Sequence, residues 1–300
     1  MANKKIKLYY FYGIIRDENN NKKLAKLSTL LKYLDSISSA ERVQEYGEGN
    51  MQLKKMNYDK EKQRWELCFL RNIIDAPFIT KLDDNTEVAE ALDEDEFIGQ
   101  ECCMIFDEKT QVIILQNNRV SISFSAISKF LSEYTEEKID LFPIVYEDKY
   151  CTISDDEGIE YKSIVIGYTD ISNLIQLSEG ENEESIKAIL KYGNSLSALS
   201  GKIEFGVGRT KGYLVKEKLK KVVNFFKKNK NATTSLKVKM FDNDNIRILD
   251  LISNKLNDSI EISVTKNDPK AFDKILYNMH SRFDVTLVET FSKCKKFTDS

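Results

Sequence analysis

The chain has 300 residues, of which 45 are lysine or arginine and 48 are aspartate or glutamate, so its formal net charge is −3. This balance excludes a uniformly basic coat for nucleic acid but leaves room for a local basic face. The single histidine excludes every mechanism and metal site that needs two. With 41% apolar and 31% charged residues, the chain is expected to fold around real cores, and its length allows two domains.

The five cysteines are an odd number without a CxxC spacing, which argues against a disulfide framework and against a zinc ribbon. No apolar run reaches the roughly 18–20 residues of a membrane helix, and the N-terminal stretch lacks the pattern of a signal peptide. We therefore expect a cytoplasmic protein without a membrane segment. The sequence predicts no metal and no cofactor.

In the first half of the chain, strand and helix signals alternate without a βαβ rhythm. Alternating apolar residues predict strands, and apolar residues at helical spacing predict helices. Two pairs of strands enclose short polar stretches and are expected to be hairpins, while Pro143 suits an edge strand or a bulge. The predicted strands are 5–15, 51–58, 64–72, 101–106, 111–116 and 139–146, and the predicted helices are 22–37 and 122–134.

The second half follows an acidic stretch with little periodicity, 147–160, which marks a predicted boundary. Beyond it, strands and helices alternate regularly, which argues for a sheet with helices packed on it. We predict an α+β or α/β protein: residues 1–150 form an N-terminal domain of mixed sheet, hairpins and helices, and residues 158–300 form a C-terminal strand–helix sandwich. Its predicted strands are 161–168, 202–207, 235–241, 259–265 and 285–291, and its predicted helices are 183–199, 214–228, 246–256 and 269–283.

Charge is separated along the chain. From Asp75 to Glu108 there are twelve acids and one base, and from Arg209 to Lys239 there are eleven bases and one acid. On the predicted helix 214–228, lysines at three- and four-residue spacings are expected to share the outer face. A basic stripe of this kind binds nucleic acid in a salt-dependent way, because neutralised phosphates release their counterions. Two alternatives stay open, a solvated helix face and a contact with the acidic stretch of the same chain or of a second copy in a homo-oligomer.

A glycine-rich loop connects a predicted strand to this helix. In the stretch from Gly206 to Gly212, backbone N–H groups could approach an anion beside a helix N-terminus, and two basic side chains could add charged donors. The spacing GxGxxxG matches neither GxGxxG nor the P-loop, so the alternative is a loop whose glycines supply unusual backbone angles. The predicted anion loop consists of Gly206, Gly208 and Gly212. The predicted nucleic-acid-binding residues are Arg209, Lys211, Lys216, Lys220, Lys227, Lys228 and Arg119.

Arg119 follows three polar residues in a predicted turn, where such side chains contact phosphates or simply cap the next helix.

Two patterns that could indicate catalysis are less specific than the basic stripe. The triplets 147–149 and 160–162 fit the acid-x-lysine pattern of metal-dependent nucleases, a pattern of low specificity in so charged a chain. His280 is predicted near a helix C-terminus, where a histidine commonly interacts with the helix dipole. We predict no catalytic residue and favour a binding protein over an enzyme.

Short patterns spread over most of the chain carry a resemblance: Leu8–Phe11, Trp65–Arg71, Pro77, Ile105–Asp107, Ile114–Arg119, Ile248–Ile252 and Leu256–Asp258. They resemble a family of uncharacterised bacterial and phage proteins found in mobile elements and defence islands. The chain is also loosely similar to the KwaB-like component of the Kiwa antiphage system, which is associated with DNA binding. The resemblance implies a role in phage–host conflict, either defence or anti-defence, and supplies no catalytic residues.

The main functional hypothesis is therefore a non-enzymatic protein of phage–host conflict that binds nucleic acid through its C-terminal basic face. One alternative is an inhibitor or adaptor that occupies a host or phage protein with the acidic stretch from Asp75 to Glu108, whose surface could mimic nucleic acid. A second alternative is a divergent metal-dependent nuclease, with the 160–162 triplet as the better candidate site because it lies at a strand start.

Overall fold

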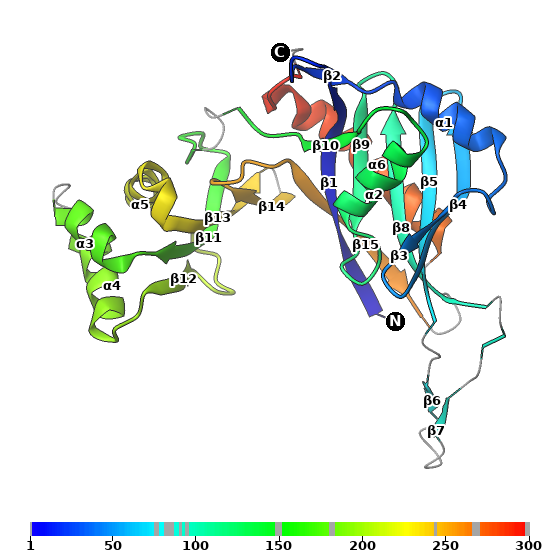
Figure 1. Cartoon of the computed structure of the whole chain (residues 1–300). Helices are drawn as coiled ribbons and strands as arrows, with labels where there is room; N and C mark the ends of the chain where they lie inside the picture. Colours follow the sequence, from blue (N-terminus) through cyan, green and yellow to red (C-terminus); the bar gives the residue numbers. More distant parts are fainter. Residues whose placement is uncertain are drawn as a thin grey trace. The chain divides into compact units, whose positions relative to one another are not determined.

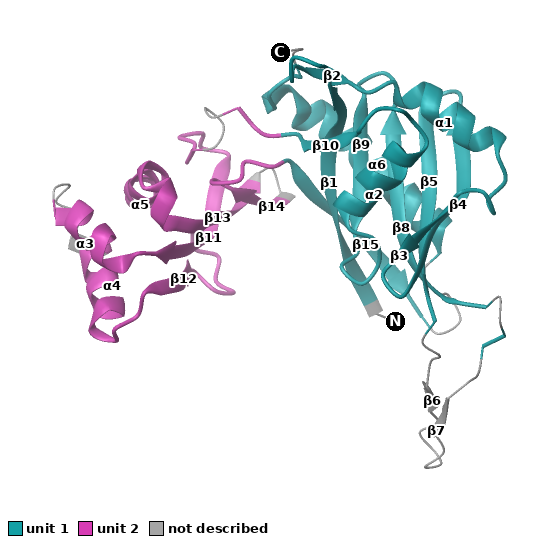
Figure 2. Cartoon of the chain, in the orientation of Figure 1, with its two compact units in different colours: residues 1–144, 256–300 teal, residues 145–255 magenta. Residues whose placement is uncertain are grey.

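The structure is a computed structural model that describes residues 2–74, 78–80, 87–89, 92–93, 96–147, 152–179, 184–242, 245–265 and 271–297. The chain divides into two compact units (Figure 2). Unit 1 comprises residues 1–144 and 256–300, and unit 2 comprises residues 145–255. Unit 2 is therefore inserted between two segments of unit 1. Together the units form a mixed α+β protein, as the sequence predicted.

Unit 1 is built on one large antiparallel sheet (Figure 1). Its strands follow the order β10-β1-β9-β8-β5-β4-β3, and β2 and β15 pair with β1 outside this path. The pairs β4–β5 and β8–β9 confirm the two predicted hairpins. The strands are β1 (Ala2–Arg16), β2 (Lys22–Leu24), β3 (Val43–Tyr46), β4 (Gly49–Asp59), β5 (Arg64–Ile73), β8 (Ile98–Asp107), β9 (Val112–Asn117), β10 (Asp140–Pro143) and β15 (Asn257–Val264). A separate short pair joins β6 (Phe78–Thr80) to β7 (Glu87–Ala89).

Helices cover both faces of the unit 1 sheet. On one face, α1 (Leu27–Ser36) and α2 (Phe124–Glu133) share a core with alternate residues of the central strands. On the other face lies α6 (Phe272–Glu289), which buries Met279 and Phe283 and is followed by the short 3-10 helix η3 (Phe291–Lys293). Because both faces are covered, β8 reads as a continuous apolar run, and its adjacent Cys102 and Cys103 are both buried free thiols.

The C-terminal part of the chain differs from the predicted division. Residues 256–300 were expected in the second domain but belong to unit 1, because β15 pairs with β1 from Ala2 to Tyr9. The predicted strand 285–291 is wrong: α6 continues to Glu289, with Phe283 and Thr286 buried at helical spacing. Its predicted start at Pro269 lies outside the described residues. The predicted helix 22–37 is split into β2 and α1, since residues 22–24 pair with β1.

Unit 2 is a two-layer arrangement of four strands and helices on one face. The strand order is β12-β11-β13-β14, and every pair is antiparallel. The helices bury apolar side chains against alternate residues of β11 and β13, such as Ile164 and Val238. The elements are β11 (Ile159–Thr169), α3 (Ile171–Glu179), α4 (Glu184–Ser195), β12 (Ser200–Gly206), α5 (Lys216–Lys228), the 3-10 helix η2 (Lys230–Ala232), β13 (Thr233–Asp242) and β14 (Asn245–Asp250).

One expectation for unit 2 fails, and one helix was not expected. The predicted helix 246–256 is instead β14, which pairs with β13 from Lys237 to Asp242. Ile246 and Ile248 place their β-branched side chains two residues apart on one sheet face, which suits a strand. The helix α3 was not predicted.

Among the described residues, no helix is long and apolar enough to cross a membrane.

Candidate nucleic-acid interface

The basic residues between Arg209 and Lys239 do not gather on one surface. The helix α5 packs on the sheet through Leu219 and Val223, which places its lysines on the helical layer. In β13, Lys237 and Lys239 alternate with the buried Leu236 and Val238, so they lie on the opposite face of the sheet. We call this face the open face; it also carries Phe241 and the half-exposed Ile246 and Ile248.

The lysines in the first turns of α5 are engaged with an acidic segment of unit 2. The ammonium of Lys216 donates a hydrogen bond to the carbonyl oxygen of Asp156, and Lys220 forms an ion pair with the carboxylate of Asp155. These contacts are at the surface and contribute little to stability, but they reduce the positive potential of this part of the helix. Lys227 and Lys228 lie in the last turn of α5, where positive charge interacts favourably with the negative end of the helix dipole.

The loop from Gly206 to Gly212 is organised around a lysine of the neighbouring strand. The Nζ atom of Lys162 donates to the carbonyl oxygens of Thr210, at 3.0 Å, and of Gly212, at 2.9 Å. The same ammonium lies 4.1 Å from the centroid of the Tyr213 ring and 5.8 Å from that of Phe241. Two carbonyl dipoles and two aromatic faces therefore hold this cation, and the cation in turn fixes the loop.

Backbone bonds complete the shape of this loop. The N–H groups of Val207 and Thr210 donate to the carbonyl oxygens of Lys162 and Val207, and the N–H group of Gly212 donates to the hydroxyl of Thr210. These three donors are satisfied within the loop or by β11 and do not converge on an anion site. Of the three glycines of the expected anion loop, Gly206, Gly208 and Gly212, the last therefore has its N–H group already bonded to Thr210.

Two of the glycines have a clear structural reason. Gly208 has a φ of +64°, a conformation that costs an L-residue about 1 kcal/mol or more. At Gly206, a Cβ would lie 3.0 Å from the Cβ of Ser163 on β11, so a side chain would push the two strands apart. The glycine pattern thus reflects the loop's backbone geometry and its close approach to β11.

Arg209 and Lys211 are the exposed cations of this loop. Among the described residues, neither forms an ion pair. They flank Thr210, whose carbonyl and hydroxyl groups are bonded within the loop. We name Lys162, Arg209, Lys211, Tyr213 and Phe241 the loop site. It combines three cations with two aromatic rings, and the Tyr213 side chain is 43% exposed.

The sequence did not place Lys162 and the two aromatic residues in this site. Lys162 is the extra residue of a bulge, because the pairing of β11 with β13 shifts between Tyr161 and Ser163. The bulge brings the lysine next to the loop, and no local pattern in the sequence indicates a bulge there. The lysine was considered only within the nuclease triplet 160–162.

The nuclease hypothesis finds no metal site in the described part of the chain. No group of three or more His, Cys, Asp and Glu side chains there is arranged to hold a metal ion. Glu160 lies opposite Phe241 in the sheet, and Lys162 is bonded to carbonyl groups. In the other triplet, Asp148 and Lys149 lie outside the described residues.

Arg119 belongs to unit 1, whereas the other predicted nucleic-acid-binding residues belong to unit 2. It is exposed in the turn after β9. Its neighbour Gln116 is buried and has a structural role: its Oε1 accepts a hydrogen bond from the N–H group of Cys103, and its Nε2 donates to Glu101. The side chain of Asn118 also donates to Glu101.

Much of the acidic stretch from Asp75 to Glu108 lies outside the described residues, including 75–77, 81–86, 90–91 and 94–95. Among its described acids, several are bonded within unit 1 rather than displayed to a partner. Glu101 accepts from two amides, Asp107 is buried beside Arg64, and Glu108 accepts from Trp65 and Tyr58. The expected acidic surface is therefore not supported by these three residues.

A buried polar cluster in unit 1 was missed by the sequence analysis. The guanidinium of Arg64 binds Asp107 at 2.8 Å and Asp284 at 2.7 Å, and its Nη1 lies 3.4 Å from Nδ1 of His280. Because arginine only donates, Nδ1 accepts, so Nε2 carries the ring proton and donates to Glu66 at 2.6 Å. The hydrogen bond from His280 lowers the pKa of Glu66. These side chains fasten α6 to β5 and β8.

Comparison with known proteins identifies a family. A family model described as a family of unknown function, DUF6731, matches residues 1–295. No curated protein matches the chain.

Proposed function

The chain belongs to the DUF6731 family, and we propose that this member binds nucleic acid through the loop site of unit 2. The observation that carries the proposal is the loop itself. Lys162 holds it in one shape, and Arg209 and Lys211 stand exposed on it without an ion pair among the described residues. A loop that is already ordered loses little conformational entropy when its cations meet phosphates.

The chemistry of the loop site suits single strands better than a duplex. Arg209 can contact phosphate oxygens with two parallel donors, and Lys211 adds a point charge. Tyr213 is 43% exposed, and stacking of a base on its ring would require bases that are not enclosed in a double helix. On the open face, Lys239 extends the positive charge beyond the loop.

Other predicted residues contribute less under this proposal. Lys216 and Lys220 already contact Asp156 and Asp155, so an incoming phosphate would have to displace these groups. Replacement of Lys216 and Lys220 should therefore weaken binding less than replacement of Arg209 and Lys211, which form no ion pair among the described residues. This order of effects distinguishes the loop site from the helix surface that the sequence alone favoured.

The test measures binding of the full chain to a fluorescein-labelled oligothymidine and to a duplex of the same length, by anisotropy, over roughly 50 to 200 mM salt. We expect tighter binding to the single strand, and affinity that falls with salt. Arg209→Ala/Lys211→Ala should reduce the slope of log K against log salt by about 1.4, because each phosphate contact to a single strand contributes about 0.7. Lys216→Ala/Lys220→Ala is the matched control and should change it less. Absence of binding at low salt, or equal slopes for both double variants, would refute the proposal.

The resemblance to proteins of mobile elements extends this proposal to a setting in phage–host conflict. Cells that produce the chain should then differ from empty-vector cells in their phage plating efficiency. The Arg209→Ala/Lys211→Ala variant should remove that difference if binding at the loop site is responsible. Equal plating efficiency of all three strains over a panel of phages would argue against this setting and leave the binding proposal to its own test.

A further inference from the structure

The first strand of unit 1 has an edge that is only partly used. On one side of β1, β15 pairs with it from Ala2 to Tyr9. On the other side, β9 pairs with it only from Lys7 to Tyr12 and ends at Asn117. Alternate residues of an antiparallel strand direct their N–H and C=O groups to opposite edges. Within the described residues, the segment 2–6 therefore has no strand partner on the β9 side.

On the opposite side of this gap, backbone groups of β8 already have hydrogen-bond partners. Where β9 no longer pairs with β8, polar side chains take over the backbone groups of β8. Gln116 accepts from the N–H group of Cys103, Asn118 donates to the carbonyl of Glu101, and Ser121 donates to that of Gln100. The gap thus lies between β8, whose backbone groups are bonded by side chains, and β1, whose backbone groups on this side pair with no described strand.

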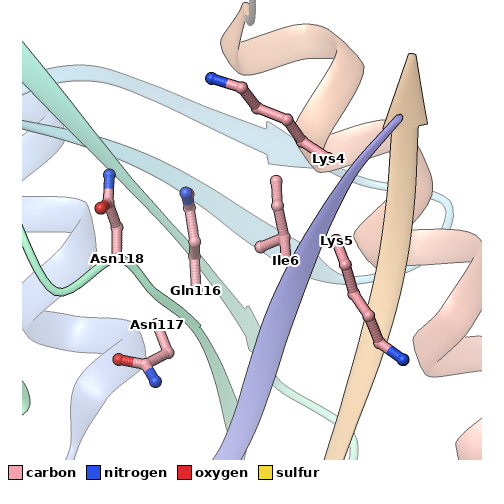
Figure 3. Close-up of a pocket in the computed structure, with 6 residues that line it drawn as sticks. All are labelled: Lys4, Lys5, Ile6, Gln116, Asn117 and Asn118. Carbon is pink, nitrogen blue, oxygen red and sulfur yellow. The ribbon is translucent and has the colours of Figure 1, made fainter. Parts of the chain in front are cut away.

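A pocket of about 220 Å³ lies at this place and is lined by Lys4, Lys5, Ile6, Gln116, Asn117 and Asn118 (Figure 3). Figure 3 shows the side chains of Gln116 and Ile6 between the two diverging strands, while Lys4 and Lys5 extend to opposite sides of β1. The volume is below the roughly 300–1,000 Å³ of sites for drug-sized ligands. Its small volume and its position beside the part of β1 that β9 does not pair suit an extended chain better than a cofactor.

The charge of this edge defines the partner. Lys4, Lys5 and Lys7 are exposed, and none forms an ion pair with another described residue. Two carboxylates are near: Glu261 lies opposite Lys5 on β15, and Glu101 is bonded by Gln116 and Asn118. Basic groups remain in excess on the strand whose backbone is free.

We propose that an extended acidic peptide segment adds to β1 at residues 2–6 as a further strand. Its backbone would pair with the free N–H and C=O groups of β1, and carboxylates at successive positions would reach Lys4 on one face of the sheet and Lys5 on the other. This is strand addition, in which main-chain bonds give affinity and side chains give specificity. It is independent of nucleic-acid binding by unit 2.

The probe is an array of short synthetic peptides in which Asp or Glu alternates with Val, Ile or Thr, tested on the full chain by fluorescence anisotropy. Matched peptides carry Lys in place of each acid, or the same acidic sequence with alternate backbone nitrogens methylated. Members of the acidic set should bind, the lysine set should not, and methylation of the nitrogens that face β1 should abolish binding. Hydrogen–deuterium exchange should slow in the segment 2–6.

Two variants separate charge from folding. Lys4→Glu/Lys5→Glu should weaken the best acidic peptide by roughly tenfold or more, because two attractions become repulsions. Lys60→Glu, an exposed lysine in the turn between β4 and β5, is the matched control and should leave binding unchanged. The proposal is wrong if no acidic peptide binds, if methylated peptides bind equally well, or if protection appears elsewhere than at 2–6.

Discussion

The sheets of the two units differ in how helices cover them. This difference decides whether their charged side chains are bonded inside the fold or exposed to a partner. In unit 1, helices bury both faces, so polar groups inside it such as Arg64 and Asp107 must find partners within the fold. In unit 2, helices cover one face, and the open face keeps lysines and two half-exposed isoleucines. The open face of unit 2 therefore still displays charged groups: Lys237 pairs with the carboxylate of Asp250, and Lys239 forms no ion pair among the described residues.

Arg64 of unit 1 and Lys162 of unit 2 show the same contrast. Arg64 is 5% exposed and is bonded to two carboxylates and a histidine, so its charge is balanced within the fold. Lys162 binds neutral carbonyl groups and aromatic rings, so its charge is not cancelled by a carboxylate there. Only the second arrangement leaves net positive charge for a partner.

The largest expected effect comes from breaking the buried cluster. Arg64→Ala should lower the free energy of unfolding by about 3–5 kcal/mol, because Asp107 would remain buried without its counter-ion. Arg16→Ala removes an exposed ion pair with Asp140 and should cost at most about 1 kcal/mol. Urea titration followed by circular dichroism measures both. Similar losses for the two variants would contradict the expected difference between a buried and an exposed ion pair.

A smaller effect should distinguish the two faces of the unit 2 sheet. Leu236→Ala removes a fully buried side chain from β13 and should cost about 2–5 kcal/mol. Ile248→Ala, on the neighbouring strand but 53% exposed on the open face, should cost less than about 1 kcal/mol. Thermal unfolding of both variants checks this. If Ile248→Ala proves as damaging as Leu236→Ala, the open face is covered in the molecule.

The smallest effect concerns pH. The pKa of Glu66 is lowered in the folded chain by the hydrogen bond from His280, from an ordinary value of 4.5. The unfolded chain therefore binds the proton more readily, and this contribution to stability is present above pH 4.5 and is lost as the pH falls through the lowered pKa. Glu66→Gln and His280→Gln should each flatten the acid side of the stability profile. Combining them should add little, whereas additive changes would show that the two side chains act independently.

Local pattern predicted most of the strands and helices, because alternation in β4 and β5, the short apolar runs of β8 and β9 and the apolar stripes of α2 and α5 are local properties. It failed where tertiary contacts decide. Residues 246–250 form a strand because β13 pairs with them, and α6 runs through the β-branched residues around Val285 because its other side packs on the sheet. Residues 22–24 likewise join β1 instead of extending α1.

The candidate site was predictable only in part. The excess of bases between Arg209 and Lys239 is visible in the sequence, but the sequence does not show that α5 and β13 place these side chains on opposite layers. It also does not show that Asp155 takes up Lys220, or that a bulge brings Lys162 to the loop. Such long-range pairings depend on the fold, which charge runs do not determine.

The insertion of unit 2 has a consequence for biosynthesis. β1 obtains its partner β15 only after all of unit 2 has left the ribosome, and α6 follows later still. Unit 2 is continuous in sequence and can become compact while the first part of unit 1 still exposes one apolar face of its sheet. We therefore expect nascent chains to be most prone to aggregation during translation of residues 145–255.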